Sequence, residues 1–444
     1  MPLYKRKEGE EQPYWPLGPF KVRLPFIHYN LESAEFIQAL IMFVVSVSMI
    51  PLIQEYLGAP YEVALAFVVV CGIGYLLPAL LGTPFIPGWI TPAIPLVLLY
   101  LGDFEPGPEA IQALVALQFL VFLIFFILGI TRLGSKIVHN VPNSLKAGII
   151  IGAGLAAFFG EIEEGGTVME TPISLIIGGL LTAYFMFSLS FRQLREKYRT
   201  AALIANYGMV PGLIIAVIIG WTIGEYPLPA IEWGITSPAF SEMWAYLPFT
   251  VGFPSLDIFL LAIPTALIAY IIAYGDIIVG TALIERTDRI REDEKIDNDI
   301  DRVHLITAIR NLIHTFFAPY PGLSGPIWTA VTATLAERYT NGRKAMDSIY
   351  GGAGTFYIAA FIALFILPLV SLFEPVLPIA LSLTLLVTGY LCVQIGIQQV
   401  KTSSERGVAG VTAVVLAVHG AAYGLLAGVV MYLLIEKTFK KKDK

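Results

Sequence analysis

The chain contains few charged residues and almost no cysteine. Asp, Glu, Lys and Arg make up 14% of its 444 residues, whereas hydrophobic residues make up 56%. Soluble globular proteins carry charge on about a quarter of their residues, so this composition excludes an ordinary soluble domain. It predicts a multi-pass membrane protein instead. Cys71 and Cys392 both fall inside apolar runs and are too few for a disulfide framework or a metal cluster.

Enzyme motifs are also missing. The sequence has no P-loop lysine motif, no HExxH pair and no histidine–cysteine cluster. We therefore expect no catalytic residue, no bound metal, no cofactor and no nucleic-acid partner. Uphill transport would then depend on a gradient of H⁺ or Na⁺. We also expect no secretory signal, because the first 30 residues carry five basic residues and no apolar core.

The most informative feature that is present is a pair of proline- and glycine-rich breaks within hydrophobic sequence. One spans 82–95 (GTPFIPGWITPAIP) and the other spans 318–330 (APYPGLSGPIWTA). Each precedes only about a dozen helix-forming residues, too few to cross a hydrocarbon core of roughly 30 Å at 1.5 Å per residue. Irregular backbone at membrane depth is tolerated only where protein buries it or where it lines a cavity. Two such breaks at corresponding places predict a transporter binding site.

The apolar runs predict fourteen membrane segments, of which the third, the tenth and the last two are short. Their ranges are 33–57, 62–81, 89–101, 109–131, 143–160, 172–190, 201–224, 255–285, 301–317, 326–337, 348–372, 376–397, 407–418 and 421–436. With a cytoplasmic N-terminus, this count assigns all 28 Lys and Arg residues, Arg310 included, to the cytoplasmic side. The positive-inside rule then predicts a protein of the cytoplasmic (inner) membrane with both termini in the cytoplasm.

The fourteen segments divide into two halves of seven. We expect a cytoplasmic N-terminal arm over 1–30, a first repeat over 31–225, an extracellular linker over 226–254, a second repeat over 255–436 and a basic cytoplasmic tail over 437–444. An odd number of segments in each half places the halves in opposite orientations. The predicted fold class is therefore an all-α polytopic membrane protein made of two inverted repeats, with half-helices at segments three and ten.

Several segments resemble a known family. The run 141–155 (VPNSLKAGIIIGAGL) resembles the fifth-span signature of the uracil/xanthine/adenine permeases (nucleobase–cation symporters, related to ascorbate transporters), and 412–436 is similar to their closing helical pair. The run 317–326, followed by 341–343 (NGR), resembles both these permeases and the sulfate permeases. The resemblance implies a core domain (segments 1–4 and 8–11), a gate domain (5–7 and 12–14), substrate held between segments three and ten, and a homodimer. The carboxylate that these permeases typically carry early in the tenth segment is absent from 324–336.

Asp276 is the sharpest single candidate for a functional residue. Glu285 marks the expected cytoplasmic end of its helix, and nine residues at 1.5 Å per residue place Asp276 about 13 Å inside. A carboxylate at this depth costs at least ~2.5 kcal/mol and is a functional hypothesis by default. We predict that it binds substrate N–H groups and takes part in proton coupling. The alternative is a structural carboxylate satisfied by backbone donors.

The other candidates come from the two breaks and from the facing helices. The half-helices that start near Trp89 and Gly325 should meet N-terminus to N-terminus, where free N–H groups and about half a positive charge on each would polarise a ligand. A plain structural kink is the alternative. Serines in the first segment occupy the position related by the repeat to the eighth segment, although such serines often bond their own backbone. The predicted substrate-binding residues are Asp276, Tyr274, Ile90, Thr91, Ser324, Gly325, Ser46 and Ser48.

Together these features predict a secondary transporter that works by alternating access in the lipid bilayer. Its expected small-molecule substrate is a nucleobase-like planar polar solute, coupled to H⁺. One alternative is a sulfate/bicarbonate-type anion transporter without a STAS domain, since two helix N-termini can hold an anion; another is an uncoupled channel. The negative charge of Asp276 disfavours a divalent anion as the substrate, because in a low dielectric the carboxylate would repel the anion by several kcal/mol.

Overall fold

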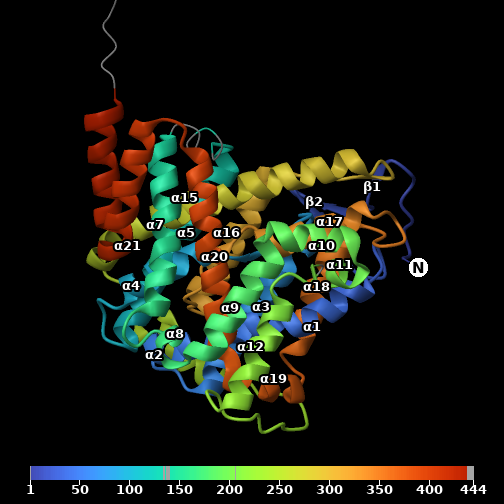
Figure 1. Ribbon diagram of the computed structural model, residues 1–444, viewed down its shortest axis with the longest axis horizontal. Helices are drawn as coiled ribbons and strands as arrows, with labels where there is room; N and C mark the ends of the chain where they lie inside the picture. Colours follow the sequence, from blue (N-terminus) through green and yellow to red (C-terminus); the bar gives the residue numbers. More distant parts are fainter. Residues whose placement is uncertain (1, 134–135, 137–140, 206, 438–444) are drawn as a thin grey trace, which may run out of the picture.

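The chain is mostly helical (Figure 1). The computed structural model describes residues 2–133, 136, 141–205 and 207–437. The described helices before residue 226 are α1 (Ser33–Val47), α2 (Ile50–Leu57), α3 (Tyr61–Leu81), α4 (Ile94–Leu101), α5 (Pro108–Thr131), α7 (Asn143–Ile162), α8 (Thr167–Glu170), α9 (Pro172–Phe187), α10 (Leu189–Lys197), α11 (Arg199–Ala205) and α12 (Val210–Ile223). Those that follow are α13 (Phe240–Met243), α14 (Pro248–Val251), α15 (Leu256–Ile290), α16 (Ile300–Phe317), α17 (Thr329–Thr340), α18 (Ile349–Ala363), α19 (Leu367–Phe373), α20 (Leu377–Gln399) and α21 (Ser403–Met431).

Three short sheets join segments that lie far apart in the sequence. Their strands are β1 (Glu10–Glu11), β2 (Trp15–Leu17), β3 (Phe20–Val22), β4 (Gly88–Trp89), β5 (Glu294–Lys295) and β6 (Ser324–Gly325). β1 pairs with β5 in parallel, β2 pairs with β3 as a hairpin, and β4 pairs with β6 in antiparallel orientation. Two of these sheets therefore connect the first half of the chain to the second.

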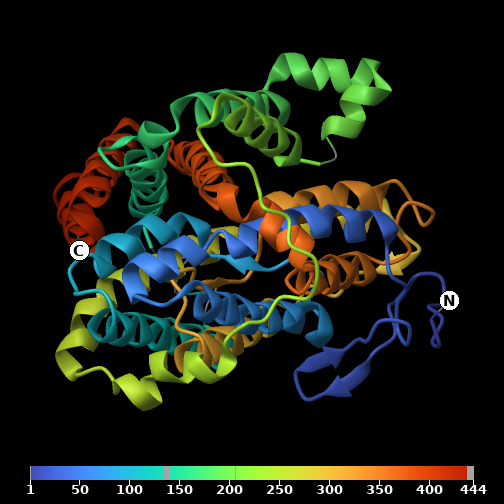
Figure 2. The ribbon, with the colours of Figure 1, turned by 90° about the horizontal axis from the view of Figure 1, so that it is seen from below.

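The helices pack in two groups (Figure 2). In the first group α5 packs against α15 and α16, and α18 packs against α1 and α3. In the second group α7 packs against α20 and α21, while α9 packs against α12 and α20. Each group therefore combines helices from both halves of the chain. The segment that follows α12, yellow-green in Figure 2, crosses from the second group to the first.

Each predicted membrane segment contains a helix of the structure, but four ranges need correction, of which 33–57 holds two helices, α1 and α2. The range 201–224 is broken between α11 and α12, where Gly208 adopts a left-handed conformation (φ 56°). The range 348–372 holds two helices, α18 and α19. The tenth segment becomes helical only at Thr329 rather than near Gly325, because the backbone of Gly325 is used for strand pairing.

Seven described helical segments are long and apolar enough to cross a membrane, or eight if the pair Pro172–Phe187 and Leu189–Lys197, bent by 63°, is one span. Three shorter apolar helices, Thr91–Leu101, Val210–Ile223 and Ile349–Ala363, accompany them. The chain is therefore a multi-pass membrane protein. Fourteen embedded segments arranged as an inverted repeat stay a prediction.

The closing helix α21 reverses direction at Gly420, which has non-helical torsions (φ 81°, ψ −174°). A Cβ atom added at Gly424 would lie 2.4 Å from Cβ of Leu416, and one at Gly428 would lie 2.9 Å from Oγ1 of Thr412. Such close contacts require the two halves of α21 to run antiparallel, so the predicted break between 407–418 and 421–436 is confirmed. Small residues allow this close approach between apolar helices.

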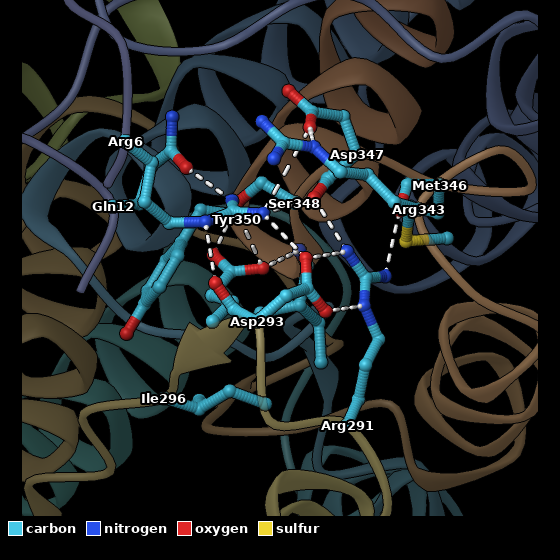
Figure 3. A network of polar contacts seen from close by, with 12 residues as sticks. Arg6, Gln12, Arg291, Asp293, Ile296, Arg343, Met346, Asp347, Ser348 and Tyr350 are labelled. Atoms are coloured by element: carbon cyan, nitrogen blue, oxygen red, sulfur yellow. Dashed lines mark hydrogen bonds and ion pairs between the residues drawn. The ribbon is translucent and has the colours of Figure 1, made fainter. Parts of the chain in front are cut away.

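The N-terminal arm is held against the rest of the protein by buried ion pairs (Figure 3). Arg6 is 7% exposed. Its guanidinium lies 3.0 Å from Oδ2 of Asp293 and 3.4 Å from Oε2 of Glu294, and it donates to the carbonyl oxygen of Asp347 at 2.9 Å. Arg291 also donates two hydrogen bonds to Asp293. The arm is thus an integral part of the first helix group. The basic tail predicted over 437–444 lies, apart from Lys437, outside the described residues.

The two acidic partners of Arg6 respond to their surroundings in opposite ways. The hydrogen bond from Arg291 is the largest effect on Asp293 and lowers the pKa of its carboxyl. Burial raises the pKa of Glu294, and this effect outweighs the opposing charge of Arg6. The ionised carboxylate of Glu294 therefore depends on Arg6 and on the hydroxyl of Ser348, which donates to it at 2.6 Å.

Replacing Arg6 should therefore destabilise the arm. In Arg6→Gln the buried carboxylate of Glu294 loses its cation, and breaking one side of a buried ion pair costs about 3–5 kcal/mol. We expect a clearly lower thermal unfolding temperature of the purified protein in detergent, together with faster proteolysis before residue 30. The control is Lys7→Gln, because Lys7 pairs with Glu10 and both side chains are exposed. Equal unfolding temperatures for the two variants would contradict this account of the arm.

Candidate functional site

The two broken stretches meet in the interior of the first helix group. Gly88 pairs with Gly325 and Trp89 pairs with Ser324 in the β4–β6 sheet. The amide of Ile90 also donates to the carbonyl oxygen of Leu323 at 2.8 Å. Each stretch therefore supplies hydrogen-bond partners that the other lacks, as irregular backbone inside a membrane requires.

Helix α16 completes the hydrogen bonding of this crossing. The amide side chain of Asn311 donates to the carbonyl oxygen of Ser324 at 2.9 Å and accepts from its N–H at 3.1 Å. Arg310 donates to the carbonyl oxygens of Gly325, at 2.6 Å, and Gly88, at 3.1 Å. Two adjacent side chains of one helix thus hold both broken stretches.

The position of Arg310 corrects the charge count. The positive-inside rule predicts a cytoplasmic position for Arg310, but Arg310 lies ten residues inside α16 and is 0% exposed. At 1.5 Å per residue this is about 15 Å from Ile300 along the helix. The one-sided distribution of basic residues therefore has an exception, and that exception lies at the crossing.

The half-helices begin beside the crossing without side-chain caps. A 3₁₀ turn (Thr91–Ala93) leads into α4, whereas α17 starts directly at Thr329. The first N–H groups of a helix have no acceptor within it and carry about half a positive charge together. Thr91 and Thr329 therefore occupy equivalent positions, each at the start of a half-helix.

A cavity of about 340 Å³ lies against these two helix starts. Trp89, Thr91, Trp328, Thr329 and Asp276 form part of its wall. The opposite wall comes from the second helix group, chiefly from α20. The polar or aromatic side chains that line the rest of the cavity include Gln38, Tyr207, Thr334, Thr384 and Thr388. The cavity thus lies between the two helix groups, a common location for small-molecule sites.

Asp276 reaches this cavity from α15. Its Oδ1 atom accepts a hydrogen bond from the hydroxyl of Thr329 at 3.1 Å. Among the described residues no Lys, Arg or His side chain forms an ion pair with Asp276. The carboxylate is therefore held by a neutral partner at the start of one half-helix and faces the cavity without a compensating cation.

The solvent-open end of the cavity carries an exposed ion pair. Arg195 of α10 donates to Oε1 of Glu337, near the end of α17, at 2.9 Å. Both side chains line the cavity, and they are 39% and 57% exposed. The cavity therefore extends from a solvated ion pair to Asp276. Arg195 belongs to the side that the basic residues predict to be cytoplasmic.

The structure does not bring all the predicted site residues to the large cavity. Asp276 and Thr91 line it, and Ser46 lines a small adjoining cavity of about 10 Å³. Ser324, Gly325 and Ile90 form the crossing itself and are buried in its hydrogen bonding.

Tyr274 and Ser48 lie away from both cavities. The ring of Tyr274 lies near the ring of His304, at a centroid distance of 6.2 Å, because residues two apart on a helix point to different faces. The hydroxyl of Ser48 donates to the carbonyl oxygen of Val45 at 2.7 Å, which is the backbone bonding that we named as the alternative. Roles of the eight residues in substrate binding stay predictions.

Sequence reasoning missed several residues of the site. The two tryptophans that flank the helix starts could have been found from the sequence. Trp328 directly precedes Thr329 and Trp89 lies two residues before Thr91, each within a broken stretch. Arg310 and Asn311 had the signal of polar residues inside a predicted span. Thr329 had none, because the register between α15 and α17 is a tertiary feature.

The residues present do not suggest a metal site. Within the described part of the chain no group of three or more His, Cys, Asp or Glu side chains is arranged to hold a metal ion. The polar groups of the cavity are hydroxyls, amides, the carboxylate of Asp276 at the buried end and the Arg195–Glu337 ion pair at the solvent-open end. This set can hydrogen-bond a small polar solute and can exchange a proton.

Comparisons with known proteins agree with this geometry. The family model Xan_ur_permease, described as "Permease family", matches residues 35–296, more than half of the chain. The solved transmembrane domain of a cyanobacterium bicarbonate transporter, BicA, has a TM-score of 0.51 at 17% identity, covering 89% of this chain and 96% of that one. SLC26A9 gives 0.53 at 15% identity (90% and 64% covered), and murine Slc26a9 in its inward-facing state gives 0.51 at 14% (91% and 68%). No curated protein matches the chain by sequence.

The match to the permease family indicates a membrane transporter. The chain belongs to the permease family whose model it matches over residues 35–296. The resemblance to the uracil/xanthine/adenine permeases is thereby confirmed at the level of the family, and the likeness to BicA and SLC26A9 shows a shared fold. At these identities the likeness carries no substrate from one protein to another.

The crossing should tolerate no side chain at Gly325. A Cβ atom there would lie 2.6 Å from the backbone carbon and oxygen of Trp89, so Gly325→Ala must separate β4 from β6. Overpacking of this kind costs about 1–3 kcal/mol, and we expect a lower unfolding temperature and weaker uptake.

The matched control is Gly410→Ala. Gly410 lies inside α21 and a Cβ atom there would meet nothing within 4 Å. Alanine is preferred over glycine inside a helix by about 0.5–1 kcal/mol, so this variant should be as stable as the parent or slightly more so. A Gly325→Ala protein with the parent's unfolding temperature would show that the crossing is not tightly packed.

Proposed function

We propose that the chain is a secondary transporter that moves a nucleobase-like planar polar solute across the cytoplasmic membrane in symport with H⁺. The observation that carries this proposal is the position of Asp276, a carboxylate that has no ion-pair partner among the described residues and lies on the wall of a cavity where two half-helices begin. Membership of the permease family supports a small-molecule substrate. The coupling ion and the substrate class are the proposed part.

The cavity wall offers the contacts that a planar heterocycle needs. Trp89 and Trp328 provide aromatic surfaces for stacking. Asp276 can accept hydrogen bonds from ring N–H groups, and the first N–H groups of the half-helices can donate to ring carbonyl oxygens. A volume of about 340 Å³ is at the lower end of the range for small-molecule sites, roughly 300–1,000 Å³.

The surroundings of Asp276 support coupling to H⁺. An ionised carboxylate without a cation is costly at membrane depth, so binding a proton removes most of that cost. The hydroxyl of Thr329 can serve either protonation state, since it can donate to the carboxylate or accept from the acid. Solvent reaches the site through the end of the cavity that carries Arg195 and Glu337.

Alternating access follows from the two helix groups. The crossing and α17 pack against α15, α16 and α18 of the first group, whereas α20 and α9 of the second group form the opposite wall of the cavity. Movement of one group against the other would expose the site to either side in turn. In this proposal the groups are the core and the gate of fourteen segments in an inverted repeat, with both termini cytoplasmic, and the protein forms a homodimer.

An anion transporter is the second candidate, and Arg310 is the observation that favours it. This buried cation and two helix N-termini lie together at the crossing. The transporter of similar fold, BicA, is named for bicarbonate.

Uptake into proteoliposomes under imposed pH and Na⁺ gradients tests both candidates. We expect labelled uracil or xanthine to accumulate when the outside is acidic, and we expect Asp276→Asn to lower this pH-driven uptake at least tenfold. Asp257→Asn is the matched control on the same helix, because Asp257 is exposed at the start of α15 and should leave uptake unchanged.

Two outcomes would contradict the proposal. Nucleobase uptake that is unaffected by Asp276→Asn would remove Asp276 from the site. Uptake of sulfate or bicarbonate without uptake of any nucleobase would replace the proposed substrate class by the second candidate.

A further inference from the structure

Arg310 is a buried cation without an acidic partner. Its side chain is 0% exposed, and in the described part of the chain it forms no ion pair with Asp or Glu. The titratable side chains that face it from α3, α16 and α18 are Cys71, Tyr75, His314 and Tyr357, and none is a carboxylate. Buried charges in proteins are normally paired, whereas the positive potential of Arg310 is not cancelled by a neighbouring carboxylate.

The guanidinium lies directly behind the wall of the small cavity. It donates to the carbonyl oxygen of Gly88 and lies over the ring of Tyr75, 4.6 Å from the ring centroid. Both Gly88 and Tyr75 line the small cavity of about 10 Å³. That cavity shares Trp89, Thr91, Trp328 and Thr384 with the large one, so only one layer of residues separates Arg310 from the site.

A second observation points to a hydrogen-bond acceptor at the same place. The indole N–H of Trp89 has no oxygen or nitrogen acceptor among the described residues and lies beside the thiol of Cys71, although Trp89 is only 5% exposed and lines both cavities. An indole N–H is a donor only, and buried donors are almost always paired. The unpartnered donor and the unpaired cation therefore favour the same kind of ligand, one that carries negative charge.

We propose that the site selects a planar monoanion. Arg310 is the positioning residue that sets this preference, because its positive electrostatic potential reaches the site from behind the cavity wall. The proposal rests on the transport function proposed above and names the charge of its substrate. Arg310 and two helix N-termini contribute positive potential near the crossing, Asp276 contributes negative charge there, and Glu337 at the solvent-open end is paired with Arg195. The balance admits one negative charge on the ligand, in particular when Asp276 holds a proton. The shared chemistry is a flat, singly charged anion, which an acidic heterocycle or bicarbonate could supply.

Arg310 also stabilises the crossing through Gly88 and Gly325, so loss of stability alone would not distinguish the two roles. Charge selectivity does distinguish them. Uracil and barbiturate have the same ring, but at pH 7 uracil is neutral and barbiturate is a monoanion. We would measure binding of uracil, barbiturate and bicarbonate to the purified full chain in nanodiscs, at one pH and one ionic strength.

We expect the parent protein to bind barbiturate at least tenfold more tightly than uracil. Arg310→Lys keeps the charge and should retain this ratio within about threefold, whereas Arg310→Gln keeps donor groups but loses the charge and should bring the ratio close to one. Asp276→Asn removes the opposing charge and should raise the ratio. Tight bicarbonate binding with weak barbiturate binding would show that the monoanion preferred by the site is an inorganic anion rather than an acidic heterocycle.

A parent that prefers neither barbiturate nor bicarbonate to uracil would overturn the proposal, as would an Arg310→Gln protein that keeps the parent's preference. If Arg310→Gln does not fold, the parent and Asp276→Asn ratios decide the question, because an unchanged ratio in Asp276→Asn contradicts the charge balance. The transport assay keeps the two proposals separate. Uracil uptake without any preference for the monoanion would leave the proposed function intact, whereas selective barbiturate binding without transport would leave only the charge selectivity.

Discussion

The structure depends on the need to satisfy backbone hydrogen bonds where no water is available. Two stretches rich in proline and glycine interrupt helices at membrane depth, and each leaves N–H and C=O groups that no helix satisfies. They satisfy one another through β4 and β6, and Arg310 and Asn311 supply the remaining partners. The half-helices, the cavity and the position of Asp276 all follow from this local solution.

The same hydrogen-bonding arrangement also sets the electrostatic potential of the site. A cation that donates to two carbonyl oxygens can be buried without a carboxylate, because carbonyl dipoles and an aromatic face solvate it. The carboxylate of the site can then remain on the cavity wall rather than being consumed in a salt bridge. Structural support and electrostatic preference are therefore supplied by one residue, and its two roles separate only when charge and hydrogen bonding are varied independently.

The sequence was informative where a property depends on local pattern. Apolar runs and Gly–Pro breaks located the helices and the two broken stretches, and the distance from Glu285 placed Asp276 deep within α15. Properties that depend on packing were not accessible. Arg310 follows a charged segment and was counted with it, because only the carbonyl oxygens of the crossing explain a deeper position. Tyr274 lies two residues from Asp276, yet helix rotation directs it to His304.

The docking of the N-terminal arm has a consequence for synthesis of the protein. Arg6 binds the carbonyl oxygen of Asp347, 341 residues further along the chain, and β1 pairs with β5 near residue 294. The ribosome must therefore complete about two thirds of the chain before the arm can pair with Asp293, Glu294 and β5, and about three quarters before it can bind Asp347. The contact with Asp347 forms only after the second broken stretch, 318–330, has been synthesised. Docking of the N-terminal arm is thus a late step of biogenesis. It can be completed only when the parts of the first helix group that are distant in sequence have come together.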